Sequence, residues 1–235
     1  GVPLNTLKLI AIAAMLIDHI AVAFVTDESW LGIVMHFVGR FTGPVMFFAA
    51  VEGWHHTHDL RRYLLRLGLF AAVSWYPFLY FKYGAAISSW LRPNVIYTIF
   101  MGVLAITVRR SEHLHALVKL AMIALIFALC VPADWGTMGL LMILVLDLFY
   151  GNFKQQAAGY CIVALCAGGL LDLLMQPFFG LFYEGEFSVD MEMLRMYLPD
   201  FGMFVPITAL SFYHGVQGRK TALTKWGFYV FYPAH

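Results

Sequence analysis

Residues 7–24 read LKLIAIAAMLIDHIAVAF, an apolar run interrupted only by Lys8, Asp18 and His19. About twenty such residues in a helix are long enough to cross the hydrocarbon core of a bilayer. Several further apolar stretches of the chain approach the same length. The pattern therefore predicts a protein built from membrane-spanning helices, with a few ionisable side chains placed deep within them.

The amino-acid composition agrees with a membrane protein. Of the 235 residues, 61% are hydrophobic and only 12% are charged, and the mean hydropathy is +0.76. In soluble domains about a quarter of the residues are charged. A soluble enzyme, a nucleic-acid-binding protein and a disulfide-linked secreted module are therefore poor interpretations of this chain. Cys130, Cys161 and Cys166 match no zinc spacing. We therefore expect buried thiols, no metal and no nucleic-acid partner.

The apolar segments predict an all-α, polytopic helical bundle with about nine transmembrane helices, forming a single integral-membrane domain over residues 1–235. The expected spans are 6–25, 31–53, 63–82, 94–109, 114–131, 137–150, 156–175 and 201–214, and a last segment begins at Trp226. Ten residues of helix rise only about 15 Å. We therefore expect the last helix, which reaches His235, to be truncated or half-inserted.

The distribution of charge predicts the orientation. If the N-terminus is cytoplasmic and the spans alternate, most lysines and arginines fall near the cytoplasmic side, as the positive-inside rule requires. These cations are Lys8, Arg61, Arg62, Arg66, Arg109, Arg110, Lys119, Lys154, Arg219, Lys220 and Lys225. Acidic residues collect in the opposite loops, and the longest of these loops, 176–200, is expected to lie over the outer mouth as a lid.

Ionisable residues at membrane depth are functional candidates, because lipid penalises charge. Along the expected helices, Asp18, His19, His36, Arg40 and His235 can meet at one level. We expect Asp18 to pair with Arg40 across the first two spans. His19 is then left facing a cavity, where it can exchange a proton. The alternative is that Asp18 and Arg40 form only a buried clamp and that His19 is a packing residue.

Other polar residues allow two interpretations each. Asn94 begins a span, where it can cap the helix or take part in binding. The basic residues Arg61, Arg62 and Arg66, with Arg109 and Arg110, can bind the phosphates of a nucleotide-bearing cofactor or merely mark the cytoplasmic side. We expect His55, His56 and His58 to form a solvated loop rather than a metal site, Glu52 and Asp147 to reach the interface, and the Gly39–Pro44 segment to kink the second span.

Four segments in order resemble the TraX family of conjugative pilin N-acetyltransferase proteins and their bacterial relatives. They are LKLIAIAAMLIDH at 7–19, GRFTGPVMFFAAVEG at 39–53, Asn94-Val95 with Thr98, and WGFYVFYPAH at 226–235. The family is similar to the wider group of transmembrane acyltransferases. The resemblance implies a multi-pass protein of the bacterial inner membrane. Thr42 and Gly43 depart from the apolar residues that relatives often carry there.

The resemblance implies transfer of an acetyl or other acyl group from acyl-CoA, as co-substrate, to an amine or hydroxyl. His19 would be the general base, Arg40 would stabilise the oxyanion or hold Asp18, and His235 would relay a proton. Tyr232 would donate a hydrogen bond, and His36 and Asn94 would contact substrate. The acceptor stays open among the pilin N-terminus, a glycan, a lipid and a small amine. Acyl length, a covalent intermediate and oligomeric state also stay open.

Two other classes of function fit the same residues. The buried Asp18, His19, Arg40 and Asp172 also suit the protonation relay of a proton-coupled transporter or flippase, although such proteins often contain internal repeats and we find none. In a scaffold for pilus or envelope assembly, the buried charges would only hold helices together.

Overall fold

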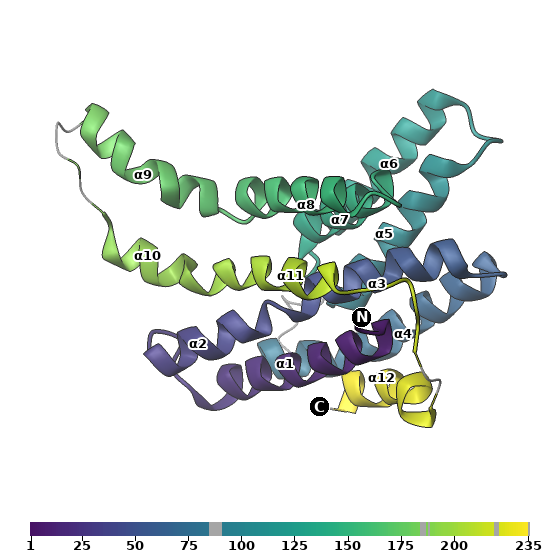
Figure 1. The fold of residues 1–235 in the computed structure, drawn as a ribbon, viewed down its shortest axis with the longest axis horizontal. Helices are drawn as coiled ribbons and strands as arrows, with labels where there is room; N and C mark the ends of the chain where they lie inside the picture. Colours follow the sequence, from purple (N-terminus) through teal and green to yellow (C-terminus); the bar gives the residue numbers. More distant parts are fainter. Residues whose placement is uncertain (85–90, 184–186, 188, 219–220, 235) are drawn as a thin grey trace. The chain divides into compact units, whose positions relative to one another are not determined.

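The computed structural model describes residues 1–84, 91–183, 187, 189–218 and 221–234, and helices make up most of this part of the chain (Figure 1). The elements are α1 (Leu4–Phe24), α2 (Trp30–Gly39), α3 (Thr42–His56), α4 (Leu60–Tyr83), α5 (Val95–Arg110), α6 (Ala116–Cys130), α7 (Gly136–Leu148), α8 (Phe153–Ala167), α9 (Leu170–Tyr183), α10 (Met191–Tyr197), the 3₁₀ helix η2 (Leu198–Phe204), α11 (Val205–Ser211) and α12 (Ala222–Ala234). The all-α prediction is confirmed for the described residues.

Among the residues that the structure describes, three helices are long and apolar enough to cross a membrane: Leu4–Phe24, Trp30–His56, which combines α2 and α3, and Leu60–Tyr83. The pair α8 and α9 qualifies as a fourth if its two helices, bent by 57° at the break, form one span. Helices α6 and α7 are apolar but shorter. Many large apolar side chains on these helices, such as Phe24 and Leu65, are exposed. Lipid is the environment that suits so much exposed apolar surface.

The second predicted span is broken where the sequence predicts a kink. Helix α2 ends at Gly39 and α3 begins at Thr42. Pro44 has no N–H with which to continue the helical hydrogen bonds across the break. The Thr42 hydroxyl donates to the Ala11 carbonyl at 2.9 Å, which fastens the start of α3 to α1.

The segment 176–200, which the sequence predicts as a loop, is largely helical in the residues that the structure describes. Helix α9 continues to Tyr183, and α10 and η2 take up most of the segment after Asp190. The Asp190 carboxylate caps α10, because it accepts hydrogen bonds from the backbone N–H groups of Glu192 and Met193. Residues 184–186 and 188, which include two of the expected acidic residues, lie outside the described part.

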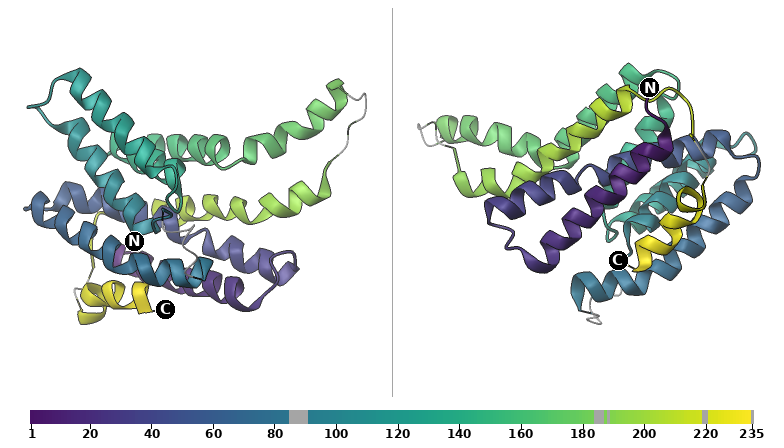
Figure 2. Two further views of the ribbon diagram at one scale, coloured as in Figure 1. Left: turned by 180° about the vertical axis from the view of Figure 1, so that it is seen from behind. Right: turned by 60° about the horizontal axis from the view of Figure 1, so that its bottom comes forward.

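The chain divides into two compact units. Unit 1 comprises Gly1–Val45 and Ala157–Gly218, and unit 2 comprises Met46–Gln156 and Arg219–His235. In unit 1, α1 packs along α2, and η2 packs on α2 (Figures 1 and 2). The Tyr160 hydroxyl in α8 donates to the Met203 carbonyl at 2.9 Å and so anchors η2. In unit 2, α5 packs against α4, α6 and α7, around a core that includes Met101, Ala105 and Leu140.

The contact between η2 and α2 requires a glycine at position 202. A Cβ atom at Gly202 would overlap the Phe37 carbonyl and crowd the Arg40 side chain. We predict that Gly202→Ala lowers the stability by about 1–3 kcal/mol, the usual cost of overpacking, measured as a lower melting temperature in detergent. Gly68→Ala is the matched control, because its Cβ would meet only ordinary contacts with Phe100. An unchanged melting temperature for Gly202→Ala would contradict this packing.

Candidate functional site

Unit 1 contains a group of ionisable residues that we call the His36 cluster: Asp18, Asp27, His36, Arg40 and Asp200. Its central contact joins α1 to α2, where His36 Nδ1 lies 2.8 Å from Asp18 Oδ1. Both side chains are largely buried, with exposed fractions of 16% for His36 and 24% for Asp18. A Cβ atom at Gly39 would overlap the Asp18 side chain. Gly39 therefore allows the carboxylate to approach α2 closely.

The second ring nitrogen of His36 faces another carboxylate. His36 Nε2 lies 3.2 Å from Asp27 Oδ1, and the Asp27 side chain is 82% exposed. An ionised carboxylate only accepts hydrogen bonds. Each ring nitrogen of His36 therefore lies against a carboxylate oxygen, and which nitrogen donates depends on the tautomer of the ring. His36 thus connects a half-buried acid to an exposed one.

Arg40 forms an ion pair with a residue of η2. Its Nε donates to Asp200 Oδ1 at 2.6 Å, and among the described residues the ionic partner of Asp18 is His36. The predicted Asp18–Arg40 ion pair is therefore wrong. Because Gly202 packs closely on Phe37, Asp200 lies next to Arg40. His36, which lies one turn before Arg40 on the helix, is the residue that pairs with Asp18.

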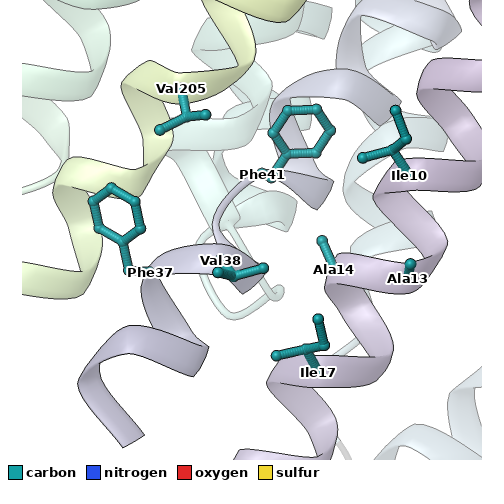
Figure 3. A pocket seen from close by; sticks show the side chains of 8 residues that line it. All are labelled: Ile10, Ala13, Ala14, Ile17, Phe37, Val38, Phe41 and Val205. Atoms are coloured by element: carbon teal, nitrogen blue, oxygen red, sulfur yellow. The ribbon is translucent and has the colours of Figure 1, made fainter. Parts of the chain in front are cut away.

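Unit 1 also contains an apolar groove of about 240 Å³. Figure 3 shows its lining side chains, which come from α1, from α2 and its end, and from α11: Ile10, Ala13, Ala14, Ile17, Phe37, Val38, Phe41 and Val205. Ile17 precedes Asp18 in the chain and Phe37 follows His36. The groove and the His36 cluster therefore share the helices α1 and α2.

Unit 2 contains a second charged group, the Asp147 cluster: His55, Arg109, Arg110, Asp147 and Tyr150. The Asp147 carboxylate at the end of α7 is fully buried. It accepts hydrogen bonds from Arg109, from Arg110 Nε at 2.9 and 3.1 Å, and from His55 Nε2 at 2.8 Å. The cluster ties the ends of α3, α5 and α7 together.

Aromatic rings complete the Asp147 cluster. Tyr150 stacks on His55 with ring centroids 3.5 Å apart, and the Arg110 guanidinium lies over Trp54 at 5.2 Å. The Tyr150 hydroxyl also hydrogen-bonds the Glu52 carboxylate, to which a phenol can donate. The interpretation of His55 as part of a solvated loop is therefore wrong, and the Asp147 side chain is enclosed by the protein rather than exposed.

The family model described as "TraX protein" matches residues 3–235. The chain belongs to the TraX family. It is also 34% identical over 239 residues to the "Probable fimbrial assembly protein FimC, serogroup H1" of Dichelobacter nodosus, an alignment that covers 97% of this chain and 91% of that protein. No solved structure matches the chain.

The structure distributes the residues predicted for this TraX-family protein over both units. Asp18, His36 and Arg40 lie together in the His36 cluster. His19 is half-buried on α1 and takes part in an interaction. Tyr232 belongs to unit 2, where its ring lies 5.8 Å from that of Phe70. His235 lies outside the described residues.

Asn94 of the TraX-family chain has a structural role in unit 2. Its side-chain oxygen accepts from the Tyr97 backbone N–H at 3.1 Å and so caps α5. Its amide nitrogen donates to the Ala71 carbonyl of α4 at 3.0 Å, and the residue is fully buried. These contacts favour the capping alternative.

The three arginines of α4 lie at the surface. Arg61, Arg62 and Arg66 are exposed, and Arg62 Nε lies 3.0 Å from the Asp59 carboxylate in the turn before the helix. Their positions agree with either alternative, phosphate binding or a mark of the cytoplasmic side.

Sequence reasoning missed Asp27, Asp200 and the pairing of Asp147. For Asp147 a signal existed, since adjacent arginines end one expected span and a lone acid lies near the end of another.

Proposed function

We propose that this TraX-family protein is a membrane-embedded acyltransferase of pilus or fimbria assembly, which transfers acetyl from acetyl-CoA to an amine or hydroxyl. The observation that carries the proposal is the 2.8 Å contact between His36 and Asp18 on apolar helices. A histidine held by a carboxylate is suited to move a proton. Family membership and the name of the fimbrial assembly relative support the biological setting.

The residues of the His36 cluster match the needs of acyl transfer. A base must remove a proton from the acceptor, and a fixed positive charge must stabilise the oxyanion that forms on the thioester carbonyl. Arg40, held in place by Asp200, supplies such a charge. His19, one residue from Asp18, keeps its proposed role in proton transfer. Tyr232 keeps its proposed role as a hydrogen-bond donor, and His235 its proposed role in proton relay.

The proposal includes the topology expected from the sequence. The chain acts as one integral-membrane domain with about nine spans, crosses the bacterial inner membrane several times and has a cytoplasmic N-terminus. The ends of α3 and α5 meet at the Asp147 cluster, and the basic start of α4 follows α3 after a short turn. This concentration of positive charge agrees with the positive-inside rule. It would also attract the phosphates of CoA to Arg61, Arg62 and Arg66.

The experiment uses the purified protein in lipid nanodiscs, radiolabelled acetyl-CoA and membranes from cells that lack this protein. We expect label to appear in an acceptor of those membranes, and His19→Ala to abolish the transfer while the variant still folds and inserts. The control is His58→Ala, because His58 is an exposed histidine outside both clusters. Absence of transfer by the wild-type protein would contradict the proposed activity. Full transfer by His19→Ala would exclude a role for His19 and would leave the proposed activity of the protein standing.

A proton-coupled transporter or flippase is the second candidate. The observation that favours it is the series of ionisable contacts from Asp18 through His36 to the exposed Asp27, because such a series can carry protons. Proteoliposomes with an imposed pH gradient test this function. Proton flux without any acetyl transfer would favour the transporter, and acetyl transfer without flux would exclude it.

A further inference from the structure

His36 lies in a series of three side chains that leads from the interior to the surface of unit 1. On one side of the ring, Asp18 Oδ1 lies 2.8 Å from His36 Nδ1. On the other side, Asp27 Oδ1 lies 3.2 Å from His36 Nε2. The exposed fraction rises along this series, from 24% for Asp18 to 82% for Asp27. A proton on Nε2 is therefore one hydrogen bond from a carboxylate that water reaches.

The turn before α2 holds Asp27 in this position. Ser29 Oγ accepts from the Gly32 N–H at 3.0 Å and donates to the Thr26 carbonyl at 2.6 Å. A Cβ atom at Gly32 would clash with the Thr26 carbonyl, so the turn lies directly on the first turn of α2. Asp27 consequently faces a histidine that is nine residues further along the chain.

We propose that His36 is the residue that takes the proton from the acceptor, that Asp18 positions its ring, and that Asp27 passes the proton on to water. This inference rests on the acyltransferase function proposed above. It differs from the sequence-based expectation, in which His19 is the general base and His36 a substrate contact.

Several charged groups surround the helix that carries His36. Those on α2, on the turn before it and on α1 and η2, which pack against it, are Lys8, Asp18, His19, Asp27, Glu28, Arg40 and Asp200, and Arg195 of α10 lies over the Trp30 ring of α2. Asp200 is paired with Arg40, which leaves the two aspartates at the ring. After the Nε2 proton has moved to Asp27 and to water, the Nδ1–H still donates to Asp18. Nε2 then has a free lone pair and can act as a base for an acceptor that takes the place of the exposed Asp27 carboxylate beside it.

Counting the protons of the reaction shows why transfer to an amine acceptor requires a path by which a proton reaches water. The amine nitrogen attacks the thioester carbonyl carbon, the C–N bond forms and the C–S bond breaks. An ammonium group that becomes an amide loses two protons in all. The leaving thiolate takes one of them, and the other must reach water. A hydroxyl acceptor loses a single proton, which the thiolate takes. The path through Asp27 therefore favours an amine as acceptor.

The test measures thiol release from acetyl-CoA by protein in nanodiscs, with the membranes described above as the source of acceptor. His36→Gln should slow the reaction by about 10²–10⁴-fold, the usual value of a positioned acid–base group. Asp27→Asn should be slow in dilute buffer and should recover as imidazole is added, because a small base then carries the proton to water. The wild-type protein and the control Glu28→Gln should not respond to imidazole.

Three outcomes separate this inference from the proposed function. If the wild-type protein releases no thiol, the acyltransferase function and this role of His36 both fail. If the wild type is active and Asp27→Asn is equally fast at every imidazole concentration, only the proton exit is overturned. If the wild type is active and His36→Gln keeps full activity, the role of His36 as the base is overturned.

A spectroscopic measurement tests the same contacts without turnover. In protein labelled with ¹⁵N histidine, the Nδ1 signal of His36 should respond to Asp18→Asn and the Nε2 signal to Asp27→Asn, because each nitrogen lies against one of these carboxylates. His36→Gln assigns the signals. An Nε2 signal that does not respond to Asp27→Asn would overturn the assigned path.

Discussion

Replacing Asp147 by asparagine should lower the free energy of unfolding by about 3–5 kcal/mol, the range found when one partner of a buried ion pair is removed. The carboxylate is fully buried and accepts hydrogen bonds from two arginines and a histidine. Asparagine keeps the shape but removes the negative charge, and it places an N–H₂ group against donors. The expected result is a much lower melting temperature in detergent and a low yield of folded protein.

The control for Asp147→Asn is Asp172→Asn, which makes the same chemical change at an exposed position on α9. We expect the control to melt within a few degrees of the wild type. Equal stability of Asp147→Asn and the wild type would show that the Asp147 cluster does not hold α3, α5 and α7 together.

Replacing Asp18 by asparagine should lower the rate of acetyl transfer by about 10²–10⁴-fold. The physical reason is that a carboxylate at Nδ1 keeps the histidine in the tautomer whose Nε2 accepts a proton, and loss of such a carboxylate has an effect of this size in other enzymes. The variant should retain acetyl-CoA binding, because the change affects the proton-transfer step. The measurement is the initial rate of label transfer at saturating acetyl-CoA, compared with Asp172→Asn.

Asp18→Asn also separates a catalytic effect from a structural one. A reduced rate at an unchanged melting temperature supports the role of Asp18 in positioning His36. An unchanged rate would contradict this role, whatever the stability of the variant.

The sequence was sufficient to predict the class of fold and the family, because both depend on local patterns. The apolar run around Asp18 predicts α1, and the Gly39–Pro44 segment predicts the break between α2 and α3, since glycine and proline act on the backbone where they stand. Asn94 is likewise found at a helix start. The count of nine spans and the cytoplasmic N-terminus stay predictions.

The pairing of the charges could not be predicted in the same way. Arg40 and Asp200 are 160 residues apart, and their contact depends on how η2 packs on α2. The acidic segment before residue 200 is typical of a loop, and nothing local indicates that it packs on α2. In the same way, nothing local indicates that the end of α5 packs beside the end of α7, and the position of Asp147 near the end of a span predicts only a residue at the interface.

The most direct test of the account is to locate the acyl group of the donor in the protein. An acetyl-CoA analogue with a photoreactive acyl group is bound to the protein in nanodiscs and irradiated, and the labelled residues are identified by peptide mass spectrometry. The account predicts labels in α1, α2 and η2, near Asp18, His36 and Arg40, that disappear when acetyl-CoA competes. Labels that acetyl-CoA does not displace, or labels confined to other helices such as α6, would contradict it.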